Sequence, residues 1–280
     1  MDLTLFQEKH LFPLYVKDKL AGVPLDYKEI NFQIDNSSPE GSAHLKAAVV
    51  LLLNFKKIND RPEYVFQLIK RSEKVSQGGD ISCPGGMLQP KQDNLLSSFL
   101  KTGLLPALRV KMARHIQKAD EETATLIRLF LTTALREAWE EIGLNPLNTK
   151  FLGALPSHSL TMFARTIFPV VCISRRQFTY KLNPEVEKVL EIPLSFFFQS
   201  ENYATLDIKT SSGYNSNLLQ YQLPCLAIPD GNGNEDILWG ATFSIIHDFL
   251  NIISDAGLPS SYSSRILNKT LTIKYISPKG

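Results

Sequence analysis

The sequence has few cysteines, no long apolar run and little net charge. Cys83, Cys172 and Cys225 are far apart and form no CxxC pair, which excludes a zinc knuckle or a dithiol redox site and predicts reduced thiols. No apolar run reaches the roughly 18 residues of a membrane-spanning helix, and the N-terminus lacks the pattern of a signal peptide. The formal net charge of +2 gives no general attraction to nucleic acid. We therefore expect a cytoplasmic protein without a membrane or nucleic-acid partner.

The 280 residues, of which 44% are hydrophobic, are enough to bury a sizeable core. Apolar runs between turn residues predict strands, and apolar residues at helical spacing predict helices. Because strands and helices are mixed along the chain, we predict an α+β fold built as an α/β/α sandwich. The predicted strands are 45–55, 64–70, 166–173 and 221–228, and the predicted helices are 5–20, 120–142 and 242–253.

We divide the chain into an N-terminal helical extension (1–42), a main domain (43–253) and a polar C-terminal tail (254–280). Within the main domain, residues of about 94–130 contain few turn signals and predict helix. This segment carries an apolar stripe of Leu105, Leu108, Met112 and Ile116. We expect the stripe to pack on the domain or on a second subunit, which would make a homodimer.

The predicted helix that begins after Asp120 and ends at Gly143 concentrates negative charge on one face. Its glutamates Glu137, Glu140 and Glu141 are spaced i, i+3 and i+4, so they fall within an arc of about 100°. The opposite arc is apolar and is expected to face the core. It consists of Leu131, Leu135, Ala138, Trp139 and Ile142.

Three like charges on one helix face destabilise the helix unless something compensates them. Arg136 can neutralise one of the charges. A divalent cation such as Mg²⁺, which prefers carboxylate and phosphate oxygens, would offset the others. Such a cation can hold a diphosphate and activate water, so this face predicts a metal site. The alternative is a solvated acidic face that pairs with lysines elsewhere.

Two segments together resemble the signature of the Nudix hydrolase family. The residues Pro84–Gly86 (PGG) resemble the start of the Nudix box, and Arg136–Leu144 (REAWEEIGL) resembles its carboxylate half. Arg136 follows Gly86 by 50 positions, where the family pattern has 14. The sequence therefore looks like a Nudix box that is split by an insertion of 36 residues.

Further matches, in the same order, resemble the coenzyme A diphosphatase branch of that family. They are Arg71–Ser72, Gly79–Gly86, Glu185–Leu194 and Trp239–Thr242. Three positions depart from the pattern. Gln77 stands where this branch usually has histidine, and Cys83 stands where it usually has phenylalanine. The acid expected at position 92 is Gln92, and Asp93 follows it one place later.

The resemblance implies hydrolysis, dependent on Mg²⁺ or Mn²⁺, of the diphosphate bond of a small nucleoside diphosphate derivative. Its best match is coenzyme A or an acyl derivative, split into 3′,5′-ADP and phosphopantetheine. Two alternatives remain: a Nudix hydrolase of ADP-ribose, dinucleotides or capped RNA, and a non-catalytic Nudix-fold ligand sensor. Sensors of this kind usually lose carboxylates of the box, and all three are present in this sequence.

The resemblance also implies catalytic roles for individual residues. Glu137, Glu140 and Glu141 would be the metal ligands, and Arg136 would pair with one of them and orient it. Glu185 is a candidate for a further ligand or general base; the alternative is an ordinary surface charge.

Substrate contacts are expected around the glycine loop. Gly85 and Gly86 would let the loop backbone pass close to the metal-bearing helix. Lys70 and Arg71 end a predicted strand near this loop and would meet substrate phosphates, or else be solvated strand-end charges. His158 has no zinc-ligand spacing around it and is interpreted as a structural or surface residue.

Overall fold

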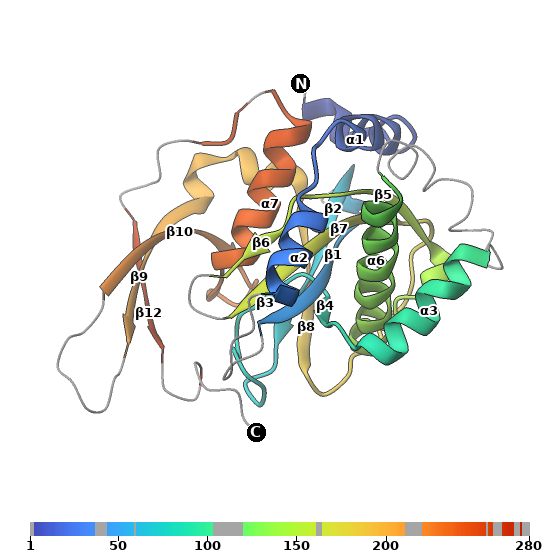
Figure 1. Cartoon of the computed structure of the whole chain (residues 1–280). Coiled ribbons are helices and arrows are strands. Elements are labelled where there is room, and N and C mark those ends of the chain that lie inside the picture. The colour runs from blue at the N-terminus through green and yellow to red at the C-terminus, as the bar shows by residue number, and fades with distance from the viewer. Residues whose placement is uncertain are drawn as a thin grey trace.

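The computed structural model describes residues 3–36, 44–58, 60–102, 120–160, 164–210, 220–255, 257–259, 265–271 and 275. A mixed sheet lies between two layers of helices (Figure 1), which confirms the predicted α+β sandwich. The α-helices are α1 (Phe12–Ala21), α2 (Tyr27–Asn36), α3 (Pro90–Thr102), α6 (Glu121–Ile142) and α7 (Gly240–Ile253). The 3-10 helices are η1 (Leu3–Gln7), η2 (Pro146–Asn148), η3 (Leu194–Phe198) and η4 (Ser200–Asn202).

Strand β1 occupies the centre of the main sheet. It runs antiparallel to β2 and β4 and parallel to β7. The order through the sheet is β3-β2-β1-β7-β5, with β8 beside β2 and β6 beside β7. The strands are β1 (Leu45–Ile58), β2 (Arg61–Arg71), β3 (Ile81–Ser82), β4 (Gly85–Met87), β5 (Thr149–Ala154), β6 (His158–Ser159), β7 (Arg165–Ser174) and β8 (Val186–Pro193).

The two faces of the main sheet bury two separate apolar cores, because successive side chains of a strand point to opposite faces. On β1, Val50 and Leu52 pack in the core under α2 and α6. Their neighbours Leu51 and Leu53 pack in the other core, under α1 and α7. A strand that is buried on both faces has a continuous apolar sequence, and such a run predicted the strand over 45–55.

The predicted N-terminal extension contributes to both cores. Phe12 on α1 is fully buried in one core, and Tyr27 on α2 is fully buried in the other. The Tyr27 hydroxyl donates a hydrogen bond to the Pro169 carbonyl of β7 (2.9 Å), and its ring meets Phe130 and Phe168 edge-on. These helices therefore hold the sandwich together from both sides.

A second sheet lies beside the main one, at the left of Figure 1. Its order is β11-β10-β9-β12, and β12 runs parallel to β9. The strands are β9 (Tyr203–Thr210), β10 (Gln220–Pro229), β11 (Glu235–Trp239) and β12 (Ile266–Leu271). Strand β12 comes from the segment that the sequence marks only as a polar tail.

The structure agrees with several predictions from the sequence, but it divides one predicted helix into two. The predicted helix over 5–20 is split into η1 and α1, because Pro13 in its middle has no backbone N–H and disrupts a preceding helical turn. Helix α3 confirms that the insertion begins as a helix, whereas the apolar stripe from 105 to 116 falls outside the described residues. The three cysteines are buried free thiols. Among the described residues, no helix is both long and apolar enough to cross a membrane.

Candidate active site

Helix α6 carries the predicted metal ligands, and both of its ends are capped as the sequence predicts. The Asp120 carboxylate accepts hydrogen bonds from the Thr123 backbone N–H (3.0 Å) and hydroxyl (2.9 Å). At the C-terminal end, Gly143 has a φ of 74°, a left-handed conformation that favours glycine. The caps determine the limits of the helix, and therefore which side chains of its last two turns face the sheet.

The three glutamates of α6 are buried to different extents, as their angular positions require. Leu135 and Ala138 belong to the buried stripe of the helix. At about 100° per residue, Glu141 lies nearest to this stripe, Glu137 lies further away and Glu140 lies on the far side. Glu141 is 4% exposed, and the side chains of Glu137 and Glu140 are 17% and 54% exposed. Glu137 and Glu141 line the same cavity.

On this helix, Glu140 lies apart from the other two glutamates, and the predicted placement of Trp139 is corrected by the structure. Glu140 does not line the cavity; its carboxylate lies 3.4 Å from the Arg136 guanidinium and is largely exposed, because it is on the far side of the helix from the core. Trp139, predicted to face the core, is 61% exposed. It lies at the edge of the apolar arc, about 70° from its centre, so the sheet does not cover it.

The glycine loop packs directly against these carboxylates. Gly85 has a φ of 150°, and its backbone N–H donates a hydrogen bond to the Glu141 carboxylate (2.9 Å). A Cβ at Gly85 would come within 2.3 Å of the Ala48 carbonyl oxygen. A Cβ at Gly86 would come within 2.5 Å of the Glu137 carboxyl carbon. Gly85 therefore requires glycine, because a Cβ there would meet the backbone of β1. A Cβ at Gly86 would displace the Glu137 carboxyl group, which supports the predicted close approach of loop and helix.

Arg136 is held mainly by Asp93 from the start of α3. Its Nε donates a hydrogen bond to Asp93 Oδ1 (2.8 Å), and Asp93 is fully buried. The same guanidinium lies 2.9 Å from a Glu137 carboxylate oxygen. Asp93, which the sequence pattern places one position late, is therefore the acid that joins the two separated halves of the motif. Of the two glutamates that Arg136 contacts, Glu137 (2.9 Å) is closer than Glu140 (3.4 Å), so Glu137 is the one that the predicted orienting role would concern.

Burial disfavours the charged forms of the carboxylates Glu137 and Glu141, and the neighbouring positive charges do not offset this effect fully. The pKa of Glu141 is raised to about 8, mainly by burial; the Gly85 N–H and the Arg71 charge oppose this rise, and the Glu137 and Glu185 charges add to it. Burial also raises the pKa of Glu137, even though Arg136 is adjacent to it. A positive charge placed among these groups would restore their ionised forms.

The donor set fits a divalent cation that the substrate helps to hold. Within the described part of the chain, no three acidic, histidine or cysteine side chains come close enough to enclose a metal ion. Mg²⁺, however, keeps several waters and is usually bound by one or two carboxylates together with substrate phosphates. Glu137 and Glu141 are suitable oxygen donors of that kind.

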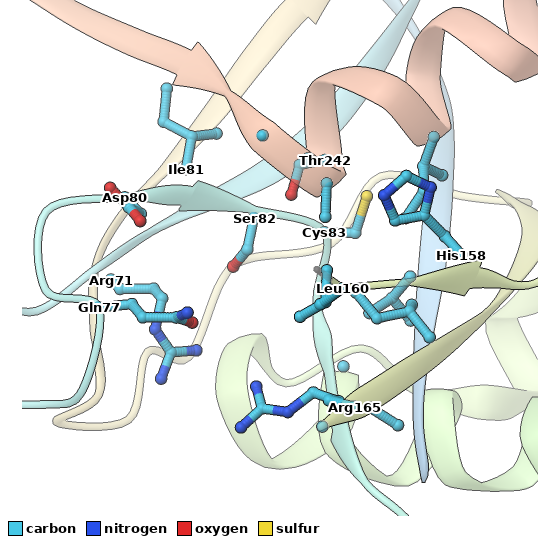
Figure 2. A pocket seen from close by; sticks show the side chains of 18 of the residues that line it. Arg71, Gln77, Asp80, Ile81, Ser82, Cys83, His158, Leu160, Arg165 and Thr242 are labelled. Carbon is cyan, nitrogen blue, oxygen red and sulfur yellow. The ribbon is translucent and has the colours of Figure 1, made fainter. Parts of the chain in front are cut away.

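The cavity in front of the carboxylates has a volume of about 680 Å³, enough for a nucleotide-sized ligand. Figure 2 shows its labelled lining residues. Strands β2, β3, β4 and β7, the start of α7 and the glycine loop all contribute to it. Its charged lining residues are Arg71, Asp80, Glu137, Glu141, Arg165 and Glu185.

Two arginines enter this cavity from different strands, and we call them the arginine pair. Arg71 ends β2, and its Nε donates to the Ser76 carbonyl (3.1 Å). Arg165 begins β7. Figure 2 shows both guanidinium groups extending into the same part of the cavity. Burial and the Arg71 charge lower the pKa of Arg165, so an anion between the two would stabilise both.

Lys70, predicted as a substrate contact, does not line the cavity. Its ammonium group makes ion pairs with Glu187 (3.1 Å) and Asp236 (3.1 Å). Between Lys70 and Arg71 the pairing of β2 with β8 shifts register, and the two side chains go to different partners, so that only Arg71 lines the cavity. Arg165 is the second cation instead. The sequence contains no local signal for it, because only the pairing of β7 with β1 brings it to the cavity.

Glu185 and His158 line the cavity from other elements. Glu185 is exposed in the loop before β8, and its carbonyl accepts a hydrogen bond from the Ser72 backbone N–H (2.8 Å). This contact joins the Glu185 loop to the residue after Arg71. His158, interpreted from the sequence as structural or surface, also lines the cavity, and burial lowers its pKa.

Comparison with known proteins agrees with the resemblance seen in the motifs. The chain is 33% identical over 130 residues to an uncharacterized Nudix hydrolase, NudL, of Pectobacterium atrosepticum, which covers 46% of this chain and 61% of that protein. It is 38% identical over 88 residues to the peroxisomal coenzyme A diphosphatase ndx-8 of Caenorhabditis elegans, covering 31% of this chain and 36% of that protein.

A further NudL protein, from Photorhabdus laumondii subsp. laumondii, is 25% identical over 191 residues, covering 67% of this chain and 76% of that protein. The first two matches each span less than two thirds of the relative's own length. No protein-family model matches the chain. The similarity of this sequence to Nudix hydrolases is thus confirmed by relatives rather than by a family model.

Proposed function

We propose that this protein, whose sequence resembles Nudix hydrolases, hydrolyses the diphosphate bond of a nucleoside diphosphate derivative with the help of a divalent cation. The observation that carries the proposal is one cavity that contains two poorly compensated carboxylates, Glu137 and Glu141, together with the arginine pair. Carboxylates suit a cation, and guanidinium groups suit phosphate oxygens, so a cation-bound diphosphate matches both sets.

Glu137 and Glu141, with Glu140 as an additional donor, would hold Mg²⁺ or Mn²⁺. A bound cation of this type supplies charge neutralisation at the phosphoryl oxygens and activation of water. Glu140 has to turn away from Arg136 to take part, since its carboxylate lies 3.4 Å from that guanidinium. Arg136, fixed by Asp93, keeps Glu137 in position beside the glycine loop.

The arginine pair binds and orients the diphosphate through charge-assisted hydrogen bonds. The exposed Glu185 accepts a proton on its carboxylate from the attacking water. The new P–O bond forms as the bridging P–O bond breaks, and the second phosphate leaves with its electron pair. Positioning and electrostatics supply most of the acceleration in such a phosphoryl transfer.

Coenzyme A or an acyl derivative is the substrate that we favour, giving 3′,5′-ADP and phosphopantetheine. The matches at Arg71–Ser72, Gly79–Gly86, Glu185–Leu194 and Trp239–Thr242 support this choice. So does the similarity to the coenzyme A diphosphatase of C. elegans. Coenzyme A carries a 3′-phosphate that ADP-ribose lacks. Of the two cations predicted for such a group, Arg71 lines the cavity, whereas Lys70 is paired with Glu187 and Asp236 outside it.

The test is a Mg²⁺-dependent screen in which products are identified by mass. Coenzyme A, dephospho-coenzyme A, ADP-ribose and NADH are compared by kcat/KM under the same conditions, with Glu141→Gln as the control for contaminating activity. Faster turnover of ADP-ribose or NADH would reject the coenzyme A assignment and leave the diphosphatase mechanism. Tight binding of one of these compounds without turnover, with Mg²⁺ or Mn²⁺ present, would reject the enzyme and favour the ligand sensor.

A further inference from the structure

The C-terminal segment reaches the cavity, although in sequence it is far from every motif of the active site. Strand β12 pairs with β9 at the edge of the second sheet opposite to β11, and its Lys269 nevertheless lies 5.5 Å from the Trp239 ring of β11. Beyond it, Tyr275 lines the cavity together with Trp239, the last residue of β11. Two aromatic rings therefore occupy one part of the cavity. Elsewhere in it, the carboxylates suit a cation and the arginine pair suits phosphates.

Asp80 in the glycine loop holds both rings. Its carboxylate accepts hydrogen bonds from Trp239 Nε1 (3.2 Å), from Lys269 Nζ (2.6 Å) and from the Tyr275 hydroxyl. Its side chain is 14% exposed. Three donors from two separate segments thus converge on one carboxylate. The edge of each ring is fixed by that contact, which pre-organises the rings.

The rings are arranged as a pair of nearly parallel plates. Their centroids are 6.4 Å apart with an interplanar angle of 25°. The Lys269 ammonium lies 5.5 Å from the Trp239 centroid and 5.8 Å from the Tyr275 centroid. Aromatic faces fixed in this way are suitable platforms for a planar nucleobase, because every base has a π-face.

The ring pair is also close to a phosphate-binding cation. The Arg71 backbone N–H donates to the Asp80 carbonyl (2.9 Å), so Arg71 and Asp80 face each other across the loop. Burial and the Asp80 carboxylate raise the pKa of the Tyr275 hydroxyl, and the nearby Arg71 charge opposes this rise in part. A nucleotide with a phosphate on Arg71 would have its base next to the rings.

We propose that Trp239 and Tyr275 form the nucleobase-binding site of this enzyme, with Asp80 and Lys269 as positioning residues. The inference rests on the proposed function, since it assumes a nucleotide in the cavity. It assigns to the C-terminal segment a direct role in substrate binding. It also predicts that affinity depends on the presence of a base, and not only on the phosphates.

The chain has two tryptophans, which makes the proposal directly measurable. Trp139 is 61% exposed on α6, so Trp139→Phe leaves Trp239 as the only tryptophan without disturbing the core. In this background, AMP should quench the Trp239 fluorescence saturably in the presence of Mg²⁺. Ribose 5-phosphate, the matched probe without a base, should not. Neither probe contains a diphosphate bond, so binding is read without turnover.

Substitutions at Tyr275 then separate stacking from structure. Tyr275→Ala should weaken AMP binding roughly tenfold by calorimetry, which is within the range for loss of one base–aromatic stack, and should leave ribose 5-phosphate binding unchanged. Tyr275→Phe keeps the ring and loses the hydrogen bond to Asp80, so it should retain most of the affinity. Thermal denaturation of each variant shows whether it is folded. If Tyr275→Ala does not fold, the fluorescence titration with AMP decides alone.

Three outcomes are distinguishable. AMP binding by calorimetry with no change in Trp239 emission would overturn the inference and leave the proposed function standing. Equal quenching by ribose 5-phosphate would also overturn it, because the phosphate alone would then account for the signal. Base-dependent quenching in a protein that hydrolyses no nucleoside diphosphate derivative would support the binding site and reject the proposed function.

Discussion

The carboxylates and the arginine pair share one cavity but are assembled differently. Glu137 and Glu141 come from one turn of helix α6, and their geometry follows from helical spacing and one pair of glycines. Arg71 and Arg165 come from strands β2 and β7, which lie on either side of β1 in the sheet. The first group is determined locally, and the second exists only after the sheet has formed.

This difference has consequences for how each group tolerates change. A helix that positions two carboxylates also buries them, so their charges are destabilising until a cation is bound. The arginines remain at strand ends that border the cavity, where a substrate anion can reach them. Substitutions in the carboxylate group should therefore affect catalysis and stability together, whereas substitutions of the arginines should affect mainly substrate binding.

The largest effect is expected from removal of one charge at Glu141. Glu141→Gln preserves the size and helix propensity of the side chain but removes a metal ligand, so kcat should fall by roughly 10²–10³-fold or more. Glu140→Gln should lower kcat by a smaller factor, because Glu140 lies outside the cavity beside Arg136. The measurement is steady-state hydrolysis at saturating Mg²⁺. Near-normal turnover of Glu141→Gln would contradict the metal assignment.

The buried ion pair between Arg136 and Asp93 provides a second test. Asp93→Ala leaves a 9% exposed guanidinium without its shortest partner, so the free energy of unfolding should fall by about 3–5 kcal/mol. The matched control is Glu122→Ala at the start of α6, the helix that carries Arg136. It breaks an exposed pair with Lys28 (2.8 Å), which solvent and salt screen, so the free energy of unfolding should change far less than for Asp93→Ala. If urea denaturation gave equal losses of unfolding free energy for Asp93→Ala and Glu122→Ala, burial of the Arg136–Asp93 pair would not explain its contribution to stability.

The raised pKa of Glu141 predicts how the stability of the metal-free protein depends on pH. Between its ordinary pKa of 4.5 and the folded value of about 8, the unfolded state has lost this proton and the folded state retains it. The free energy of unfolding should therefore decrease as pH rises, by up to about 2.7 kcal/mol between pH 5 and pH 7. Denaturation in EDTA measures this slope, and Glu141→Gln should flatten it. A stability that rises over this pH range in the wild type but not in the variant would contradict the sign.

The smallest effects should come from the cationic residues, and they separate Lys70 from the arginine pair. Arg71→Ala or Arg165→Ala should lower kcat/KM by roughly 10- to 30-fold, through loss of one charge-assisted contact. Lys70→Ala should change kcat/KM less than about twofold, because Lys70 is engaged with Glu187 and Asp236 away from the cavity. A larger loss for Lys70→Ala than for Arg165→Ala would reverse this assignment of substrate contacts.

Several features were predictable from the sequence because they depend on residues close together in the chain. The limits of α6 follow from Asp120 and Gly143, and the order of burial within it follows from helical spacing. The apolar run of β1 predicts a strand buried on both faces. The close contact of glycine loop and helix followed from the resemblance to the split box, and the Gly85 N–H and the Glu141 carboxylate do meet.

The sequence alone determined the sandwich, the carboxylate helix and the glycine loop, because helical period, strand period and capping are local properties. Only the tertiary structure decided that Asp93 joins the two halves of the motif, that Arg165 rather than Lys70 faces the cavity, and that Tyr275 lines it. The physical reason is the same in each case. Which residues share a cavity depends on strand order and register, and no short-range pattern in a single sequence specifies the pairing of segments that are far apart.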